Sequence, residues 1–389
     1  MADGTEGDRK RAVGRVVRGE AIAAVSSSLG YSREWLYKWL RRYRSGDPDW
    51  FRERSRRPRH RPLQTPEEVE LLVETTRGRL EKAGEFSGAQ AIRWDLEDQD
   101  VQALPSMRTI NRILARQGLT NRRSGPYQSK GKKYPKLIAA APGDVHQTDF
   151  VGPCYLRGGL RFYGLNSVDL ATGRSASEST LTRHAQATMD AIWSSWGRLG
   201  MPRNQQVDNE MVFYGSPRYP RAMGPLLRLC LLHEIDLWFI PVAEPWRNGV
   251  VEKYNDLWQQ KFLGRINLAS HSELRMQNLL FEGRHNGRYR YSKLQGRTPM
   301  QALKASGQEL RFPPDGPAPR HPLPQPDKGR YHLVRFVRSD GVLDVFGEKF
   351  LAPPECTYEY VRVTVDVSRQ RLQIFLDQQI VDEHCYLRS

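Results

Sequence analysis

Residues 145–150 read Val-His-Gln-Thr-Asp-Phe, a short strand-forming run with an acidic side chain, Asp149, in its second half. From about residue 141 onward, such runs alternate with helical stretches, which predicts an α/β domain over 137–312. The expected strands are 145–150, 161–169, 174–181, 204–208 and 236–240. The expected helices are 184–199, 219–233, 247–263, 271–285 and 298–306.

A short helical unit begins the chain, with a predicted domain at 1–62. Gly30 interrupts two helical stretches, and Ser32 is placed to cap a helix over 32–43. The inward side of that helix is apolar, and its outward side carries Arg33, Tyr37, Lys38 and Arg41. This pattern is typical of a helix-turn-helix, although an ordinary three-helix bundle with a solvated basic face has the same pattern. A basic arm follows, and it includes Arg56 and Arg57.

A second helical unit is predicted at 63–136. Thr65-Pro66-Glu67-Glu68 forms a strong helix start, because it combines an N-cap threonine, a proline at the first helical position and an early glutamate. Helices are expected at 66–83, 88–97 and 106–117, the last with Arg108 and Arg112 on its outer face. We interpret these helices as a second helix-turn-helix, followed by a basic linker that contains Lys132 and Lys133.

The C-terminal part begins with a proline-rich linker at 313–328. Short alternating strands then predict a small β-barrel at 329–389. The expected fold class is therefore multidomain: an all-α tandem helix-turn-helix region, an α/β core and a small C-terminal β-barrel.

Charge indicates the class of partner. The 389 residues include 60 Lys and Arg against 44 Asp and Glu, a formal net charge of +16. Such a basic surplus favours a polyanionic partner, nucleic acid first. No stretch approaches the ~20 apolar residues of a membrane span, and the N-terminus lacks the features of a secretory signal, so we expect neither secretion nor membrane insertion. The four cysteines form no zinc-binding pattern.

Three acidic residues stand out by position. Asp149 lies on the first expected strand of the α/β domain, Asp208 ends the strand at 204–208, and Glu252 lies one turn into the helix at 247–263. Two strand-borne aspartates and a helix-borne glutamate are expected to converge at one edge of the sheet. Carboxylates held together repel one another unless cations neutralise them, and oxygen ligands of this type prefer Mg²⁺ or Mn²⁺.

The residues around these acids resemble a known family. Asp149-Phe150-Val151-Gly152-Pro153 resembles the first-strand motif of the integrase core in DDE transposases. The segment 163–169 resembles its second strand, 207–209 its second-aspartate motif, and 248–255 (Asn-Gly-Val-Val-Glu-Lys-Tyr-Asn) its glutamate helix. The two N-terminal units are similar to those of bacterial insertion-sequence transposases with a retroviral-integrase-like core.

The resemblance implies an RNase H-like core that cleaves DNA at an element's ends and joins the freed 3′-OH to target DNA. It implies that Asp149, Asp208 and Glu252 bind two Mg²⁺ ions, for which Mn²⁺ can substitute. Double-stranded DNA is the expected partner, bound by a homodimer or a larger assembly in the bacterial cytoplasm, on the nucleoid. Arg247 and Lys253, beside the glutamate, are further expected DNA contacts.

Two departures from the family pattern concern the second and third acids. Between Asp208 and Glu252 lie 43 residues, whereas 35 lie between Asp208 and Glu244, and the family's usual spacing matches the shorter count. Glu252 is nevertheless preferred, because it lies in the Asn-Gly-x-x-Glu context and Pro245 biases Glu244 away from helical geometry. An insertion around 214–224 accounts for the excess. Glu210 stands where the family often has glycine.

Two other functions fit the same sequence. One is a catalytically silent DNA-binding repressor or domesticated factor derived from a transposase. The other is a metal-dependent nuclease that cleaves DNA without joining it. The presence of all three acids argues against the first, and the tandem helical units argue against the second.

Overall fold

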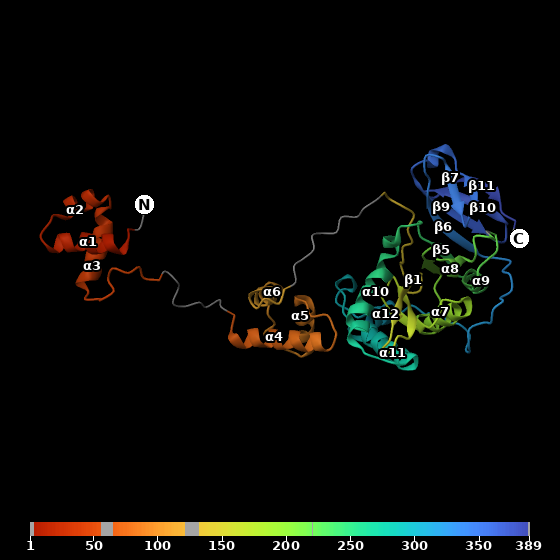
Figure 1. Cartoon of the computed structure of the whole chain (residues 1–389), viewed down its shortest axis with the longest axis horizontal. Helices are drawn as coiled ribbons and strands as arrows, with labels where there is room; N and C mark the ends of the chain where they lie inside the picture. Colours follow the sequence, from red (N-terminus) through yellow and green to blue (C-terminus); the bar gives the residue numbers. More distant parts are fainter. Residues whose placement is uncertain (1–3, 56–64, 121–131, 220, 388–389) are drawn as a thin grey trace. The chain divides into compact units, whose positions relative to one another are not determined.

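The computed structural model describes residues 4–55, 65–120, 132–219 and 221–387 (Figure 1). These residues form two compact units, Met1–Pro66 and Glu67–Ser389. The predicted basic residues Arg56 and Arg57 lie outside the described residues. Among those described, no helix combines the length and apolar character that a membrane span requires.

The first unit contains three helices, α1 (Glu6–Val17), α2 (Ile22–Leu29) and α3 (Arg33–Arg44). Gly30 adopts a left-handed conformation with φ 73° at the C-cap of α2, and the Ser32 hydroxyl accepts the N–H of Trp35 to cap α3. Leu36, Trp39 and Leu40 of α3 are buried against the other two helices. The expected outer face of α3 therefore remains exposed.

The second unit begins with α4 (Glu67–Lys82), α5 (Ala89–Asp98) and α6 (Met107–Arg116). Ile110, Ile113 and Leu114 of α6 are buried in a core shared by the three helices, and Ser106 caps α6. All three helices lie within a residue or two of the predicted ranges.

A nine-stranded mixed sheet forms the centre of the second unit, with the order β11-β10-β9-β6-β5-β4-β1-β2-β3. Its N-terminal strands are β1 (Val145–Tyr155), β2 (Arg161–Asp169), β3 (Ser175–Thr180), β4 (Asn204–Val207) and β5 (Asp236–Phe239). The helices that accompany this sheet in the chain are α7 (Ala185–Leu199), α8 (Met211–Tyr214), α9 (Pro225–Leu232), α10 (Gly249–Lys261), α11 (His271–Arg288) and α12 (Pro299–Ser306). The predicted α/β core is thus confirmed.

Helices pack on both faces of this sheet. Leu165 on β2 belongs to the core shared with α7 and α9, whereas Phe162 and Val168 belong to the core shared with α10 and α11. Leu165 has an odd number and the other two have even numbers, so they lie on opposite faces, since side chains alternate along a strand. Gly164 lies on the α10 side, where a Cβ would approach the Trp258 ring to 3.0 Å. The small residue therefore permits close contact between β2 and α10.

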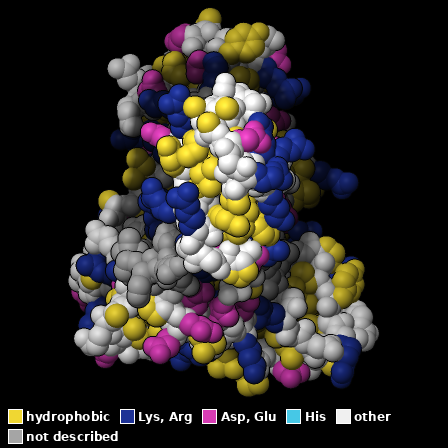
Figure 2. All heavy atoms as spheres, turned by 90° about the vertical axis from the view of Figure 1, so that its left-hand side faces the viewer, with side chains coloured by type: hydrophobic (Ala, Val, Ile, Leu, Met, Phe, Trp, Pro, Cys, Tyr) yellow, Lys and Arg dark blue, Asp and Glu magenta, His cyan; other side chains and the backbone are white. Residues whose placement is uncertain are grey.

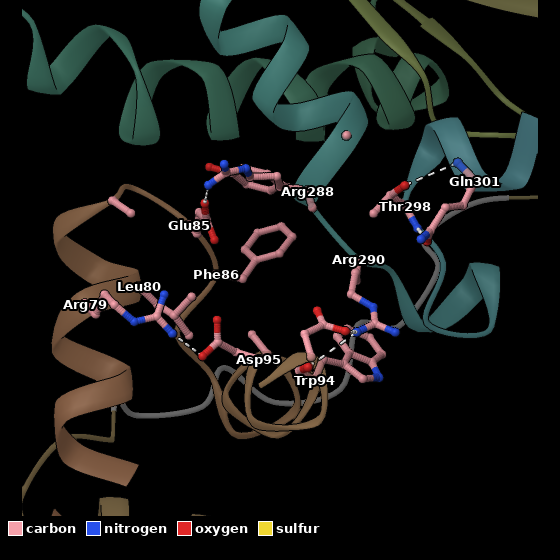
Figure 3. A pocket seen from close by; sticks show the side chains of 15 residues that line it. Arg79, Leu80, Glu85, Phe86, Trp94, Asp95, Arg288, Arg290, Thr298 and Gln301 are labelled. Atoms are coloured by element: carbon pink, nitrogen blue, oxygen red, sulfur yellow. Dashed lines mark hydrogen bonds and ion pairs between the residues drawn. The ribbon is translucent and has the colours of Figure 1, made fainter. Parts of the chain in front are cut away.

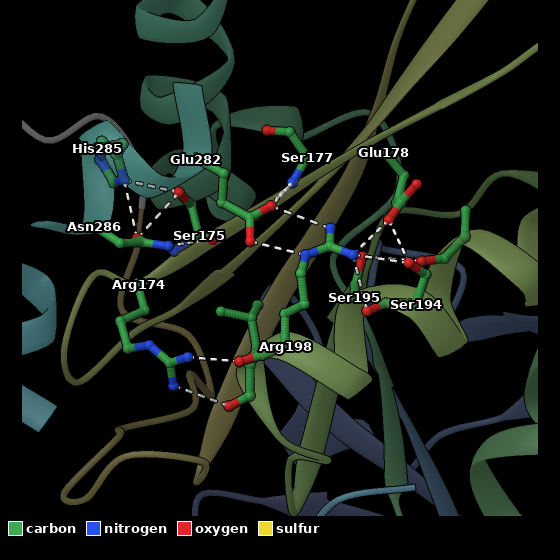
Figure 4. Close-up of polar contacts among 12 residues, drawn as sticks. Arg174, Ser175, Ser177, Glu178, Ser194, Ser195, Arg198, Glu282, His285 and Asn286 are labelled. Atoms are coloured by element: carbon green, nitrogen blue, oxygen red, sulfur yellow. Dashed lines mark hydrogen bonds and ion pairs between the residues drawn. The ribbon is translucent and has the colours of Figure 1, made fainter. Parts of the chain in front are cut away.

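The outer edge of β3 is covered by side chains of α11 (Figure 4). Asn286 exchanges two hydrogen bonds with the backbone of Ser175, and Glu282 accepts the N–H of Ser177. Arg198 of α7 then forms ion pairs with both Glu282 and Glu178. Unpaired strand edges promote aggregation, and here the helix side chains replace the missing neighbour strand.

The C-terminal strands extend the core sheet. They are β6 (Arg330–Phe336), β7 (Val342–Val345), β8 (Glu348–Leu351), β9 (Tyr360–Asp366), β10 (Arg371–Leu376) and β11 (Gln379–Cys385). β6 pairs in parallel with β5, with Leu237 opposite Tyr331, and β7 and β8 form a separate hairpin. The predicted separate, closed β-barrel is therefore not confirmed. The physical reason is a shared core, because Leu333 and Val363 are buried in the same cluster as Leu237.

The α4–α6 helices dock on α10 and α11 through the C-terminal end of α4. Arg265, Arg284 and the Tyr289 hydroxyl donate hydrogen bonds to the carbonyls of residues 81, 83 and 84, and Lys261 donates to that of residue 85. Cations at a helix C-terminus are favoured by its unpaired carbonyls. A cavity of about 350 Å³ lies beside this contact, with Phe86, Trp94 and Arg290 among its lining residues (Figure 3).

Candidate active site

The pairing of β1 with β4 brings the two candidate aspartates to the same level of the sheet. The strands are parallel, with Val145 opposite Asn204 and Gln147 opposite Gln206. Continuing this register by two residues places Asp149 level with Asp208, which directly follows β4. β4 ends there, whereas β1 continues along β2 to Tyr155, so the two carboxylates lie on neighbouring strands where the β1–β4 pairing ends.

The start of α10 is attached to β1 by buried side chains. The Oε1 atom of Gln147 accepts the N–H groups of Val250 and Val251, both at 3.1 Å. Asn248, almost fully buried, donates from Nδ2 to the backbone oxygen of Thr148 at 3.2 Å. These bonds satisfy free donors in the first turn of α10 and fix Glu252, in that turn, relative to β1.

Two asparagines hold the side chain of Asp149. Asn255, one turn after Glu252, donates from Nδ2 to Oδ2 of Asp149 at 2.8 Å. Asn166, directly opposite Asp149 on β2, donates to the Asn255 side-chain oxygen at 2.9 Å. The Asn255 amide is thus oriented by one partner and donates to the other.

The acidic residues affect one another's protonation. Burial, together with the carboxylates of Asp208, Glu210 and Glu252, raises the pKa of Asp149 to about 7. Burial also raises the pKa of Asp208 to about 6, against the lowering effect of the hydrogen bond from the Glu210 N–H. The pKa of Glu252 is raised by burial and by Asp256. Clustered carboxylates disfavour simultaneous ionisation, and such a cluster is a feature of functional sites.

Glu210, the residue that departs from the family pattern, has a cationic partner. Arg183 forms an ion pair with Glu210 at 2.8 Å, and its guanidinium lies over the rings of Tyr163 and Phe150. The backbone N–H of Glu210 donates to Oδ1 of Asp208 at 3.0 Å. Glu210 therefore shapes the turn after β4 and adds a charge that Arg183 balances.

Glu244, the alternative third acid, lies in a different environment. It precedes the short helix η1 (Pro245–Asn248), and its Oε2 accepts the Nε–H of Arg247 at 2.8 Å. The hydroxyl of Tyr360 on β9 donates to its other oxygen. The Glu252 carboxylate, by contrast, is one of the groups that raise the pKa of Asp149.

The donor set suits a hard divalent cation in its chemistry. All the candidate ligands are carboxylates, and a cation would relieve the repulsion that raises the pKa of Asp149. Across the described part of the chain, however, no three His, Cys, Asp or Glu side chains are grouped closely enough to hold a metal ion. Asp149 and Asp208, level on neighbouring strands, remain the candidate ligands, and Glu252 in the first turn of α10 stays a predicted third ligand.

The expected DNA contacts differ in their surroundings. Arg33, Tyr37 and Arg41 on α3, Arg108 and Arg112 on α6, and Lys133 and Lys253 are exposed. Lys38 and Lys132 form ion pairs with Glu53 and Glu359. Lys and Arg side chains are interspersed with acidic ones on the face drawn in Figure 2.

Arg247 has partners that its local sequence does not indicate. Its side chain is 9% exposed, with the guanidinium 3.8 Å from the Tyr134 ring centre and paired with Glu244. A DNA contact by Arg247 stays a prediction. The residues that sequence reasoning missed are Gln147, Asn166, Arg183 and Asn255. Asn166 and Asn255 lie inside the family-like segments 163–169 and 248–255, whereas Gln147 and Arg183 lie outside these motifs.

Comparisons with solved structures give partial likenesses to retroviral integrases. The HTLV-2 integrase catalytic core domain in complex with magnesium, in its trimeric form, matches 43% of this chain and 99% of that domain, at 18% identity and a TM-score of 0.33. The dimeric form of that domain matches 42% of this chain and 98% of the domain, at 18% identity and a TM-score of 0.33. A simian T-cell lymphotropic virus intasome in complex with PP2A regulatory subunit B56 gamma matches 67% of this chain and 81% of that chain, at 13% identity and a TM-score of 0.37. No protein-family model matches the chain. At these TM-scores, the likenesses do not define the activity of this chain.

Proposed function

We propose that the chain is a DDE-type DNA transposase with an RNase H-like core, which cleaves DNA ends and joins the 3′-OH to target DNA. The observation that supports the proposal is that Asp149 and Asp208 lie level with each other on the neighbouring strands β1 and β4, and that burial together with the carboxylates of Asp208, Glu210 and Glu252 raises the pKa of Asp149 to about 7. Such a cluster of acids suits metal-dependent chemistry on a phosphodiester better than it suits binding alone.

In this proposal Asp149 and Asp208 hold the divalent ions, Mg²⁺ or Mn²⁺, and Glu252 completes the second ion site. Bound there, the ions would activate an attacking oxygen and stabilise the leaving oxygen of the phosphodiester. The protein's own residues prepare the site. Asn255 orients the Asp149 carboxylate, and Gln147 fixes the start of α10 on β1.

The two helical units are proposed to read the element ends. The exposed basic faces of α3 and α6 have the composition needed to contact phosphates and base edges. Joining two ends requires at least two protomers, so we propose a homodimer or larger assembly on DNA. The predicted domain limits, 1–62, 63–136, 137–312, 313–328 and 329–389, remain part of this proposal, with the last segment joined to the core sheet through the pairing of β6 with β5.

An end-cleavage and joining assay tests the proposal. The substrate is the DNA that flanks the coding sequence in its genome, with Mg²⁺ present. We expect the wild-type protein to cut and join this DNA, and Asp149→Asn and Asp208→Asn to do neither. Asp190→Asn, an exposed acid on α7, serves as the matched control and should retain activity. Tight binding to the DNA by the wild-type protein without any cleavage would contradict the proposal and favour the DNA-binding repressor.

A further inference from the structure

The C-terminal strands reach the acidic edge of the core at two points. β6 contributes Arg335, and β9 contributes Tyr360. Neither residue belongs to the segment that carries the candidate acids, and both were expected in a separate domain. Arg335 contacts Asn209, next to Asp208, and Tyr360 contacts Glu244, in the segment that leads into α10 and Glu252.

Arg335 holds the turn that follows β4. It is 6% exposed, and its Nη2 donates to the side-chain oxygen of Asn209, directly after Asp208, at 3.0 Å. Asn209 in turn donates to the backbone oxygen of Ile240 at 2.6 Å, and Arg335 donates to the same oxygen at 3.4 Å. A buried guanidinium in contact with neutral oxygens is costly unless all its donors are used, so this geometry is narrowly defined.

Tyr360 holds the start of α10. Its hydroxyl donates to Glu244, which pairs with Arg247, and the Arg247 guanidinium lies 3.8 Å from the ring centre of Tyr134 and 5.3 Å from that of Tyr360. The backbone oxygen of Arg247 accepts a hydrogen bond from Gln206 on β4. The short helix that leads into α10 is therefore attached to β9 on one side and to β4 on the other.

We propose that β6 and β9 are positioning elements of the acidic site. Arg335 positions Asp208 through Asn209, and Tyr360 positions the first turn of α10, with Glu252, through Glu244 and Arg247. This inference rests on the proposed function, because it assigns these residues to the geometry of a divalent-cation site. It also gives Glu244 a role other than that of a metal ligand.

The test compares two tyrosine variants that lose the same group. Tyr360→Phe removes only the hydroxyl that contacts Glu244, whereas Tyr358→Phe removes an exposed hydroxyl two residues earlier. The measurements are Mn²⁺ affinity from the electron paramagnetic resonance signal of free Mn²⁺, the rate of DNA joining, and the thermal midpoint as a check on folding. We expect Tyr360→Phe, which acts on Glu252 through Glu244 and Arg247, to weaken Mn²⁺ binding by up to about tenfold, the lower end of the loss seen when a direct partner of a metal ligand is removed, and Tyr358→Phe to match the wild type.

Arg335 is tested with a graded series. Arg335→Met is expected to weaken Mn²⁺ binding by at least the same factor, and Arg335→Lys to restore part of it. Arg330→Met, at the exposed start of the same strand, is the control. Where Arg335→Met does not fold, Arg335→Lys and Tyr360→Phe decide the question. Wild-type Mn²⁺ affinity and joining in both of these variants would overturn the inference.

The Asp149→Asn variant distinguishes failure of the proposed function from failure of this inference. If Asp149→Asn binds Mn²⁺ as tightly as the wild type, the metal site itself is wrong. Amide hydrogen exchange at Glu210 and at Val250–Val251 then tests the positioning alone. Faster exchange in Tyr360→Phe and Arg335→Lys would support it, and unchanged exchange would overturn it.

Discussion

The side-chain amide of Asn255 donates a hydrogen bond to the carboxylate of Asp149, with 2.8 Å between Nδ2 and Oδ2. This bond joins α10 to β1 at the level of the candidate acids. Asn166 fixes the orientation of the amide from the opposite strand, so the donor is directed at Asp149. The contact connects the helix that carries Glu252 with the strand that carries the first aspartate.

Loss of this amide should reduce activity more than stability. Asn255→Ala leaves the Asp149 carboxylate without its donor, and we expect joining to slow about 10- to 100-fold. The free energy of unfolding should fall by about 1–3 kcal/mol, the cost of unpaired buried polar groups. Asn286→Ala, a buried asparagine of α11 that contacts β3 instead, should lose similar stability and keep its joining rate. Equal losses of joining in both variants would contradict this role of Asn255.

The ion-pair cluster at the edge strand should be important for stability. Arg198→Met leaves Glu178 and Glu282 without their cation, and Glu282 is almost fully buried. We expect the free energy of unfolding to fall by about 3 kcal/mol, as for other broken buried pairs, measured by urea denaturation. Adding Glu282→Gln should recover part of that loss, because it removes one unpaired charge. No change in the single variant would show that the cluster contributes little.

Two buried histidines should destabilise the fold in acid. Burial lowers the pKa of His146 and of His285 from 6.5 to about 4, so between these values the unfolded chain binds more protons than the folded one. Stability then falls as the pH drops, by up to about 1.4 kcal/mol per pH unit for each histidine.

The contribution of His146 can be separated by difference. Asp149 and Asp208 titrate in the opposite sense, since their pKa values are raised. Urea denaturation of the wild type and of His146→Gln between pH 7 and pH 5 should therefore give a smaller loss of stability in the variant. Parallel pH profiles would rule out a neutral, buried His146.

The outer face of α3 should contribute to DNA binding. Arg41→Ala removes an exposed cation, and we expect weaker binding to the element end together with a salt dependence of log K reduced by about 0.9 for one lost phosphate contact. Gel-shift titrations at several salt concentrations measure both effects. Arg18→Ala, an exposed arginine of the same unit outside α3, should change neither. An unchanged affinity in Arg41→Ala would exclude this face from recognition.

Local sequence patterns predicted most helices and strands but not all the partners of the strands. The caps at Ser32 and Ser106 are encoded within a few residues, so they could be predicted directly. The alternating valines of β9 (Val361, Val363 and Val365) predict a strand, but no local pattern shows that β6 pairs with β5, with Tyr331 opposite Leu237. That pairing is long-range, and it replaced the expected separate barrel with an extension of the core sheet.

The candidate site shows the same limit. Asp149, Asp208 and Glu252 were selected from their local contexts, and the carboxylates of Asp208 and Glu252 contribute, after burial, to the raised pKa of Asp149. The partners of Arg247 and Arg335 are distant in sequence, at Tyr360 and Asn209, and an isolated arginine gives no sign of them. Arg247 was therefore expected to contact DNA, whereas in the structure its largely buried side chain pairs with Glu244.

Comparing Glu252→Gln with Glu244→Gln in the joining assay decides which glutamate acts with Asp149 and Asp208. Both substitutions remove one charge and keep the side-chain length. The account predicts that Glu252→Gln abolishes joining, while Glu244→Gln still joins at a reduced rate. Wild-type joining by Glu252→Gln, or its loss only in Glu244→Gln, would contradict the assignment of Asp149, Asp208 and Glu252 as the catalytic acids.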